Sequence, residues 1–418
     1  MSKVCFGAKF AKIIIIITIV EQVIIIGSGI IGLATALKLK EYNPQIKLLV
    51  LEKEKEIARH QTGNNSGVIH SGLYYKPGSL KAQNCIKGYN MLTAFCDKQD
   101  IPYDICGKIV VATEKDQLPA LDVLYNRGTE NGLKGLKKLN KEQLKEIEPH
   151  VNGIEGIHVP QAGIVDYSVV SKKYKSLIED GGAKFIFNCK VNDIQSFKGH
   201  HIVKTSQGDF ETTLVINCAG LYSDKVAMMV EKKLNIRILP FRGEYFKLKK
   251  DKEYLVNNLI YPVPNPNFPF LGVHFTRMMK GGVEAGPNAV LSYAREGYKK
   301  TDINLSEFIE TITWPGLLKV AAKYWKVGLG ELHRSYSKAA FTRALRELIP
   351  EIQADDLETG GAGVRAQACD RNGGLIDDFI IYEQAGIINV CNAPSPAATS
   401  SLSIGETIAT MAKEQLNQ

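Results

Sequence analysis

An uninterrupted apolar run at residues 23–26 is the first strong pattern of the chain. A strand covered on both faces of a sheet shows such a run, whereas a half-exposed strand alternates between apolar and polar residues. A helical pattern follows over residues 33–40, and a second apolar run over residues 47–51. This order of strand, helix and strand predicts a parallel βαβ unit.

The later patterns predict a chain of mixed α/β class without internal repeats. Charged, lysine-rich residues 116–148 predict an exposed helical stretch, and Gly-rich residues 62–72 and 360–363 predict loops. Further helices are predicted in residues 164–179, in residues 303–350 and from about Ser400 onward. Strands are predicted at residues 183–187, 214–218 and 387–390, and within residues 241–283 around a turn at 262–269.

Residues 1–22 form an extension before the βαβ unit. Lys3, Lys9 and Lys12 precede an apolar run at residues 13–20. This run is shorter than the ~20 apolar residues that a spanning helix needs, and no small-residue cleavage site follows it. Three interpretations stay open: an organellar presequence, a membrane-contacting anchor, or an additional leading strand.

A glycine-rich turn joins the first strand to the first helix. Gly27, Gly29 and Gly32 have the spacing G-x-G-x-x-G, and Glu52 closes the second strand 20 residues after Gly32. In this motif the glycines allow a tight turn, close approach of a pyrophosphate and close packing of helix on strand. The helix N-terminus attracts phosphates, and Glu52 would accept hydrogen bonds from a ribose. The unit predicts a site for FAD or NAD, because an acidic residue at position 52 disfavours a 2′-phosphate.

Composition narrows the class of protein further. The 418 residues are 44% hydrophobic and 23% charged, which is typical of a globular protein with two to three domains. The net charge of +8 is spread over the chain, and this favours weak attraction to anions or lipid headgroups over nucleic-acid binding. None of the eight cysteines has C-x-x-C spacing, so we expect no metal site, reduced thiols and a reducing compartment.

Residues 60–78, with the sequence HQTGNNSGVIHSGLYYKPG, decide between the two dinucleotides. Together with the glycine motif they resemble the D-amino-acid-oxidase superfamily of FAD-dependent oxidoreductases. Further segments resemble the L-2-hydroxyglutarate dehydrogenase/oxidase family within that superfamily. These segments are residues 79–82, 240–245, 269–276, 363–368 and 392–405. The resemblance covers nearly the whole chain after residue 22.

The resemblance implies non-covalently bound FAD and an α/β fold, α+β overall. A Rossmann-like FAD-binding domain would be combined with a discontinuous substrate domain built on a mixed sheet. It also implies oxidation of L-2-hydroxyglutarate to 2-oxoglutarate, with hydride transfer from C2 to flavin N5. The expected FAD-binding parts are residues 23–95, 151–236 and 356–418, and the expected substrate-domain parts are residues 96–150 and 237–355.

The same resemblance implies additional FAD contacts. Ser66 and Gly67 would run beneath the flavin, while Ala219 and Gly220 at a strand end would lie near the phosphates. The last helix would present N–H groups to the flavin O2 edge, where negative charge develops on reduction. The residues expected there are Ser400, Ser401 and Leu402.

Oxidation of a 2-hydroxy acid needs a base for the hydroxyl proton and cations for the carboxylates. Arg365 is the candidate for a bidentate carboxylate contact, and Arg242 for the second carboxylate. His70 and His274 are the candidate bases, since imidazole titrates near neutral pH. Each of these residues has a structural alternative, such as an ion pair between Arg365 and Asp377.

The expected partners are a small dicarboxylate substrate and an electron acceptor, either oxygen or a membrane quinone. Peripheral membrane contact is a further expectation, and a nucleic-acid partner is not expected. The location would be mitochondrial in a eukaryote, and cytoplasmic or inner-membrane-associated in a bacterium. Two alternatives stay open: oxidation of glycerol 3-phosphate or an amino acid, and a non-catalytic flavin-binding protein.

Overall fold

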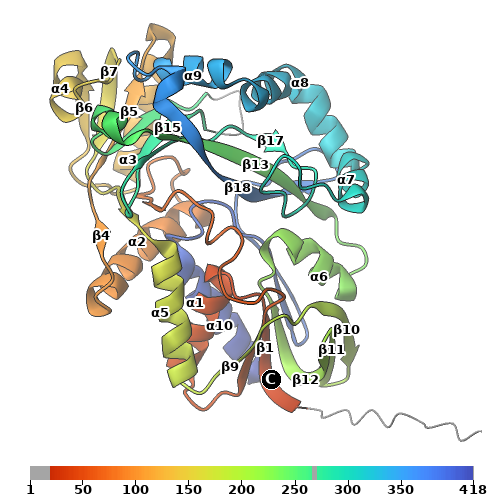
Figure 1. The fold of residues 1–418 in the computed structure, drawn as a ribbon. Helices are drawn as coiled ribbons and strands as arrows, with labels where there is room; N and C mark the ends of the chain where they lie inside the picture. The colour runs from red at the N-terminus through yellow and green to blue at the C-terminus, as the bar shows by residue number, and fades with distance from the viewer. Residues whose placement is uncertain (1–18, 266–270, 418) are drawn as a thin grey trace, which may run out of the picture.

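The computed structural model describes residues 19–265 and 271–417. Figure 1 shows two stacked parts, with a largely parallel sheet and its helices below and a second, larger sheet above. Residues 19–22 of the expected extension belong to the first strand, whereas residues 1–18 of that extension and residues 266–269 of the turn expected at residues 262–269 lie outside the described residues.

The lower sheet contains the predicted βαβ unit. Strand β1 (Ile19–Ile26) lies between β2 (Leu48–Leu51) and β12 (Gly208–Asn217), and both neighbours are parallel to it. The remaining strands extend this sheet on both sides. They are β9 (Lys184–Ile186), β10 (Val191–Phe197), β11 (His200–Thr205), β19 (Ile380–Gln384) and β20 (Ile387–Asn392).

Helices on both faces explain the uninterrupted apolar runs. Ile25 and Val50 pack in one core with residues of four helices, whereas Ile24 and Leu49 pack in a second core with Val226 of α6. Successive residues of a strand point to opposite faces, so both sets have to be apolar. The helices are α1 (Ile30–Tyr42), α5 (Tyr167–Asp180) and α10 (Ser401–Leu416) on one side, α2 (Leu80–Lys98) beside α10, and α6 (Ser223–Val230) on the other side.

The upper sheet is mixed, and its longest pair is β13 (Ile236–Leu248) with β18 (Leu357–Asp370). The other strands are β5 (Lys108–Ala112), β6 (Lys137–Asn140), β7 (Glu155–Val159), β14 (Leu259–Pro262), β15 (His274–Arg277), β16 (Val283–Gly286) and β17 (Val290–Leu291). A small third sheet consists of β3 (Val68–Ile69), β4 (Tyr103–Asp104) and β8 (Gly163–Val165).

In Figure 1 helices α8 (Pro315–Tyr336) and α9 (Lys338–Arg346) lie above the upper sheet, and α7 (Leu305–Ile312) lies at its right-hand end. Helices α3 (Leu118–Glu130) and α4 (Lys141–Ile147) lie near β5, β6 and β7. Among the described residues, no helix combines the length and the apolar character that crossing a membrane requires. The seven described cysteines are free thiols, and six of them are buried.

Three local predictions were wrong. Residues 360–363 belong to β18 instead of a loop, because their backbone pairs with β13; a Cβ at Gly363 would lie 2.6 Å from the Asn64 carbonyl oxygen. The stretch predicted as helical between residues 116 and 148 contains strand β6. The stretch 62–72 contains the short strand β3. In each case pairing with a distant strand replaces the local preference.

Strands β7 and β18 pair with strands of the upper sheet, although the expected domain limits assign them to FAD-binding parts. We propose that both strands are counted with the substrate domain, because a domain is built around a common sheet and core.

Candidate active site

The glycine turn after β1 has the geometry of a dinucleotide cradle. Gly27 has a φ of +101°, and a Cβ on it would lie 2.6 Å from the Cys218 carbonyl oxygen. A Cβ on Gly32 would lie 2.1 Å from the Gly27 carbonyl oxygen, so side chains are excluded at both positions. Beside Gly29, in contrast, the nearest described atom is the Thr62 hydroxyl at 3.6 Å. The backbone is therefore open where a pyrophosphate would approach, and the residues fit a dinucleotide.

Glu52 is locked to this turn. Its carboxylate accepts hydrogen bonds from the Ser28 N–H at 2.9 Å, the Ser28 hydroxyl at 2.6 Å and the Glu54 N–H at 2.9 Å. A carboxylate has about four acceptor positions, so capacity for a ribose hydroxyl remains. Glu52 would thus both shape the loop and bind the nucleotide.

The end of β12 lies directly beside the turn. The Cys218 N–H donates to the Ile26 carbonyl at 2.9 Å, and a Cβ on Gly27 would lie 3.3 Å from the Ala219 Cα. Gly220 has a φ of +54° and starts a short helical turn. Ala219 and Gly220 thus join the glycine motif at the carboxyl end of the parallel strands, where such sheets bind ligands.

Thr399 connects the start of α10 to the segment that contains His70. Its hydroxyl accepts from the His70 N–H at 3.1 Å and lies 2.8 Å from the Tyr167 hydroxyl. The next residue, Ser400, is fully buried, and its hydroxyl has no hydrogen-bond partner among the described residues. Because such a group is costly, a ligand at this helix start is physically favoured. Ser401 and Leu402 follow in the first turn of α10.

Ser66 and Gly67 lead into β3. Gly67 has a φ of +69°, donates to the Asn65 side chain at 2.8 Å and accepts from the Val165 N–H at 2.8 Å. Upstream of this pair, the Thr62 hydroxyl accepts from the Ile30 N–H at 3.0 Å. The whole segment is thereby held against the start of α1.

Aromatic rings and a buried lysine line the face of the upper sheet that lies toward this segment. The His274 ring stacks on the Tyr261 ring with centroids 4.0 Å apart. The Lys108 ammonium lies 4.8 Å from the Tyr261 ring centre and 4.5 Å from that of Tyr74. Lys108 is only 2% exposed, and the described residues offer its ammonium no carboxylate or carbonyl partner. A buried cation without a hydrogen-bonding anion is the strongest sign of an anion site here.

The electrostatics show which charged groups lie close together. Burial, Arg365 and Lys108 lower the pKa of His274 to about 3. Burial, Lys108, His274 and Lys81 lower the pKa of His70 to about 3. The structure therefore brings three sequence candidates together, namely His70, His274 and Arg365, and both histidines are neutral near pH 7. Burial also lowers the pKa of Lys108 to about 7.

The hydrogen bonding of His274 fixes its tautomer. Nδ1 lies 2.9 Å from the Gly272 carbonyl oxygen. Since a carbonyl oxygen only accepts, Nδ1 carries the hydrogen, and Nε2 of the neutral ring keeps a lone pair. His274 can therefore act as a base through Nε2.

A family model described as "FAD dependent oxidoreductase" matches residues 22–411. The chain belongs to this family of FAD-dependent oxidoreductases. It is 63% identical to an L-2-hydroxyglutarate dehydrogenase of Indibacter alkaliphilus, over 93% of this chain and 97% of the relative. It is 45% identical to a mitochondrial L-2-hydroxyglutarate dehydrogenase of Nematostella vectensis, over 94% and 91% of the two chains. The resemblance inferred from the sequence is confirmed.

Solved structures support the same fold. An FAD-bound L-alpha-glycerophosphate oxidase from Mycoplasma pneumoniae superimposes with a TM-score of 0.77 at 23% identity, covering 96% of both chains. A glycine oxidase from Geobacillus kaustophilus gives 0.72 at 16% identity, covering 95% of both. The predicted fold class of this FAD-dependent oxidoreductase is confirmed.

Sequence reasoning missed Lys108 in this oxidoreductase. It opens the apolar run of β5, and its side chain lies on the same side of the strand as that of Val110. A lysine is rarely buried without a partner. The available signal was a lysine directly before the apolar run of residues 109–112, where no strand was predicted.

Arg242 is placed differently from the other candidates. Its guanidinium donates to the Glu244 carboxylate at 3.1 Å and to the Lys299 carbonyl at 3.2 Å. Glu244 also accepts from Ser335 of α8 at 2.7 Å. Arg242 thus contacts the α8 side of the sheet. Arg365, in contrast, lowers the pKa of His274. Asp377, the alternative partner named for Arg365, binds Lys81 at 2.6 Å.

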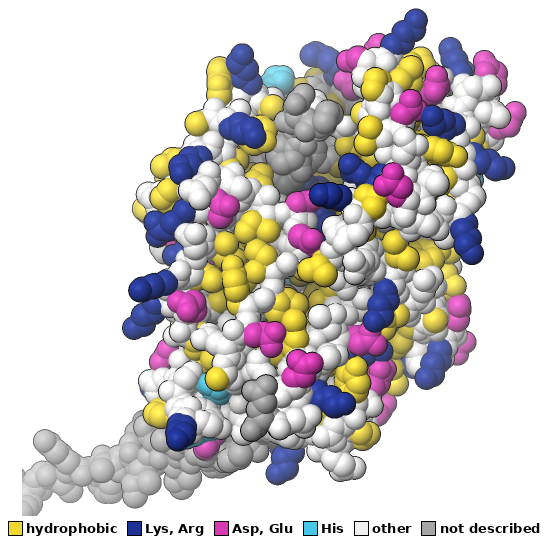
Figure 2. Space-filling model, turned by 180° about the vertical axis from the view of Figure 1, so that it is seen from behind, with side chains coloured by type: hydrophobic (Ala, Val, Ile, Leu, Met, Phe, Trp, Pro, Cys, Tyr) yellow, Lys and Arg dark blue, Asp and Glu magenta, His cyan; other side chains and the backbone are white. Residues whose placement is uncertain are grey.

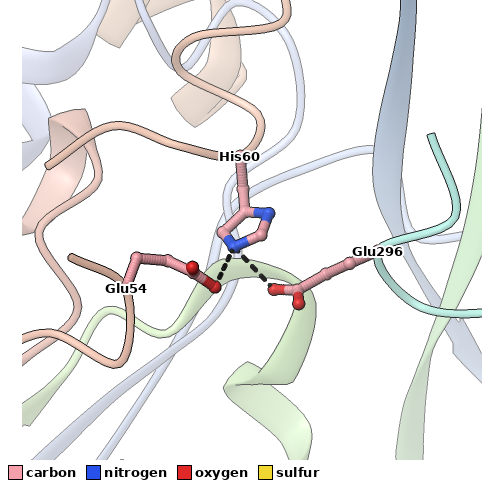
Figure 3. Close-up of side chains that lie close together, drawn as sticks. All are labelled: Glu54, His60 and Glu296. Atoms are coloured by element: carbon pink, nitrogen blue, oxygen red, sulfur yellow. Dashed lines mark hydrogen bonds and ion pairs between the residues drawn. The ribbon is translucent and has the colours of Figure 1, made fainter. Parts of the chain in front are cut away.

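A second cluster joins the two parts of this flavoprotein. Figure 3 shows the His60 ring between Glu54 and Glu296, with Nε2 2.9 Å from an oxygen of each carboxylate. Such a trio has ligand atoms suited to a metal ion. However, the Lys53 ammonium already lies 2.6 Å from Glu54 and 2.7 Å from Glu296. Lys53 therefore already balances part of the carboxylate charge, and the cluster ties the loop after β2 to the segment between β17 and α7.

Proposed function

We propose that the chain oxidises L-2-hydroxyglutarate to 2-oxoglutarate with FAD as the redox cofactor. The observation that carries this proposal is the buried Lys108 ammonium, which lies 4.8 Å from the centre of the Tyr261 ring on which His274 stacks; Arg365 adds a second positive charge that acts on His274. A substrate with a carboxylate at each end offers one anion for each cation. The names of the curated relatives support the same substrate.

Each residue then has a role that its surroundings allow. The planar fork of Arg365 holds the carboxylate beside C2, and Lys108 holds the distal one. His274 takes the hydroxyl proton on Nε2, and Tyr74 and Tyr261 keep water away from the reacting centre. Bound FAD supplies the acceptor for the hydride that leaves C2.

The cofactor would be held without a covalent bond. Gly27, Gly29 and Gly32 with Glu52 would bind the adenosine and pyrophosphate part, with Ala219 and Gly220 beside them. Ser66, Gly67 and the start of α10 would bind the flavin part. Denaturation should release intact FAD into the supernatant. Colour that stays with the chain would instead indicate attachment through a residue such as His70.

Two other functions are weighed against this one. Oxidation of glycerol 3-phosphate or an amino acid keeps the fold, since the glycerophosphate and glycine oxidases share it. A non-catalytic flavin-binding protein would leave the Arg365–Lys108–His274 arrangement without a use.

An anaerobic substrate screen distinguishes the three functions. L-2-hydroxyglutarate should bleach the flavin, while D-2-hydroxyglutarate, glycerol 3-phosphate and amino acids should not. If none of these substrates bleaches the flavin, the proposal that the chain is an enzyme is refuted.

The reduced flavin can pass its electrons to molecular oxygen or to a membrane quinone. Comparison of turnover with oxygen and with a soluble quinone analogue under argon identifies the acceptor. The location follows the source of the chain: mitochondrial in a eukaryote, as the names of eukaryotic relatives state, and cytoplasmic or inner-membrane-associated in a bacterium.

A further inference from the structure

Two adjacent residues of the upper part, Arg295 and Glu296, reach the nucleotide cradle of the lower part. They lie in the segment between β17 and α7. This segment is held to the upper sheet by the hydrogen bond from the Ser292 N–H to the Pro240 carbonyl of β13 at 2.9 Å. The charged groups of Arg295 and Glu296, in contrast, bind residues of the lower part.

Arg295 holds the turn that follows Ala219 and Gly220. Its guanidinium donates to the two carboxylate oxygens of Asp224 at 2.6 and 2.9 Å, and to the Leu221 carbonyl at 2.6 Å. Arg295 is 2% exposed and Asp224 is fully buried. A buried pair of this kind stays together, because removal of one partner leaves an uncompensated charge. The turn beside the expected phosphates is therefore anchored to the upper part.

Glu296 holds the loop that follows Glu52. Its carboxylate lies 2.7 Å from the Lys53 ammonium and 2.9 Å from His60 Nε2, and Figure 3 shows the contact with the imidazole. Lys53 directly follows Glu52, and the Glu54 N–H donates to the Glu52 carboxylate at 2.9 Å. The loop that carries the candidate ribose ligand is thus bound to the upper part through the residue next to that ligand.

The contact with His60 extends to a third segment of the cradle. His60 begins a tight turn that carries Thr62, and the Thr62 hydroxyl accepts from the N–H of Ile30, the first residue of α1, at 3.0 Å. Tyr298 stacks on the His60 ring with centroids 5.9 Å apart, and its hydroxyl lies 3.3 Å from His60 Nδ1. Residues 295–298 therefore contact all three segments that surround the expected adenosine and pyrophosphate.

The Tyr222 ring connects the contacts of Arg295 with those of Glu296. Its centre lies 5.4 Å from the Lys53 ammonium and 5.6 Å from the Arg295 guanidinium. Its hydroxyl donates to the Glu307 carboxylate of α7 at 2.7 Å. The two sets of contacts thus form one continuous structure along the cradle.

We propose that residues 295–298 act as a clamp that retains FAD by fixing the segments around its adenosine half. The cradle binds the cofactor only while these segments keep their relative positions, and the clamp fixes the positions from the other part of the molecule. Arg295, Glu296 and Tyr298 are thus positioning residues that act through the cradle. The proposal rests on the non-covalent binding of FAD proposed above, and it is independent of the substrate.

The charges around His60 give the clamp a dependence on pH. Glu54 and Glu296 face ring Nε2, the Lys53 ammonium lies 3.2 Å from the same atom, and Tyr298 faces Nδ1. Although burial favours the neutral ring, the two carboxylates raise the pKa of His60. Loss of the imidazole proton leaves two carboxylates opposite one ammonium, so the clamp should weaken as the pH rises through this pKa.

Distant surface charges should contribute little to this dependence. On the face of the molecule that Figure 2 shows, Lys and Arg side chains are interleaved with Asp and Glu. Opposite charges that alternate in this way largely cancel at a distance, and salt screens what remains. The pH dependence of FAD retention is therefore expected to follow the groups of the clamp.

The dissociation rate of FAD tests the clamp directly. Full-length, FAD-loaded protein is mixed with an excess of isotope-labelled FAD, and mass spectrometry follows the unlabelled FAD that stays bound. Glu296→Gln keeps the size of the side chain and removes its charge. It should raise the rate about three- to tenfold at pH 7, because charge-assisted contacts at a partly exposed site are lost.

Glu351→Gln is the matched control. Glu351 also pairs with a histidine, at 2.7 Å from His150 Nδ1, but this pair lies in the upper part away from the cradle. The same chemical change there should leave the dissociation rate of FAD unchanged. A difference between the two variants therefore reports the position of the pair and not the general loss of a carboxylate.

Two further measurements separate a positioning role from a structural one. In the wild type the dissociation rate should rise as the pH increases above 6.5, and in His60→Asn this rise should be absent. Lys53→Arg keeps the positive charge and should retain FAD like the wild type, whereas Lys53→Met should lose it faster. A side chain that merely stabilises the fold would show neither the pH effect nor the rescue by arginine.

The possible outcomes are distinguishable. A dissociation rate of Glu296→Gln within about twofold of the wild type, with the same pH profile in His60→Asn, would overturn the proposal. Equal losses of Tm in FAD-free and FAD-loaded Glu296→Gln, at an unchanged rate, would also overturn it. Flavin that stays with the denatured wild-type chain would refute non-covalent binding and the clamp with it. Anaerobic bleaching by L-2-hydroxyglutarate tests the substrate separately.

Discussion

Replacing Lys108 by methionine should make the protein more stable and a poorer catalyst. Methionine keeps the unbranched length of the side chain between the Tyr74 and Tyr261 rings but removes the charge. Burial lowers the pKa of Lys108 from 10.5 to about 7. At 1.4 kcal/mol per tenfold, the charged form disfavours folding by about 4 kcal/mol near pH 7, as an order of magnitude.

The sign of the pH dependence follows from this lowered pKa. The folded state binds the lysine proton less tightly than the unfolded state does. The penalty is therefore fully present below pH 7 and disappears as the pH rises from about 7 to 10.5. Wild-type protein should gain Tm over this range relative to Lys108→Met. At pH 7 the variant should melt a few degrees higher than the wild type.

Catalysis should change in the opposite direction. Loss of one charge-assisted contact is worth roughly 1.5–3 kcal/mol. The value of kcat/KM for L-2-hydroxyglutarate should therefore fall about ten- to a hundredfold. L-2-hydroxybutyrate lacks the distal carboxylate, so its kcat/KM should stay within about twofold. Anaerobic stopped-flow reduction of the flavin measures both values.

Lys40→Met provides the matched control. Lys40 is also buried, but its ammonium donates to the Pro44 carbonyl at 3.1 Å and to the Ile46 carbonyl at 2.8 Å. This control should lower Tm and leave the kinetics unchanged. If Lys108→Met instead melts lower than the wild type and turns over L-2-hydroxyglutarate normally, Lys108 is a structural residue and the assignment of the distal carboxylate is refuted.

Three further predictions concern the other sites. Arg365→Lys should lower kcat/KM on the order of ten- to a hundredfold, about 1.4–2.7 kcal/mol, because the planar fork is lost; FAD content measured by absorbance should not change, and turnover of Arg365→Ala within about twofold of wild type would make the residue structural. Glu52→Ala should raise the Kd for FAD by about one to two decades in fluorescence titrations; an unchanged Kd would make Glu52 merely a loop anchor. Although burial favours the neutral ring, the carboxylates of Glu296 and Glu54 raise the pKa of His60. The stabilisation is complete below pH 6.5 and is lost as the pH rises through the raised pKa, so wild type should lose its Tm advantage over His60→Asn on going from acidic to alkaline pH; a constant Tm difference would contradict the cluster's role.

The sequence was sufficient for the βαβ unit of the lower sheet because its signals are local, whereas β10, β11 and β19 of the same sheet were not predicted. The apolar runs at residues 23–26 and 47–51 need no knowledge of distant segments, and neither does the glycine turn between them. Strand β6 was missed because its lysines face solvent at the edge of a sheet, where charged residues are common. Strand β18 was missed because its glycines are typical of loops. Close backbone contacts, which only the tertiary structure shows, explain Gly360 and Gly363 but not Gly361.

The residues of the candidate site fall into the same two groups, those that a local sequence pattern predicts and those that only the tertiary structure brings together. Gly27, Gly32 and Glu52 follow a fixed local spacing that a single sequence displays. His70, His274 and Arg365 were found through short family-like segments, without information on their mutual placement. Lys108 belongs to none of these segments. Its importance depends on the absence of an anionic partner in the fold, and no local pattern encodes that absence.

The arrangement of charges also links substrate binding to the strength of the base. Burial, Arg365 and Lys108 hold His274 in its neutral form, so Nε2 is a weak base before substrate arrives. In the proposed binding mode, a dianion would place one negative charge beside each cation, which would oppose their effect on the ring and raise the pKa of His274. A monoanion compensates one cation only and leaves the other acting on the imidazole. The second carboxylate would therefore contribute twice, once to binding through Lys108 and once to proton transfer through His274.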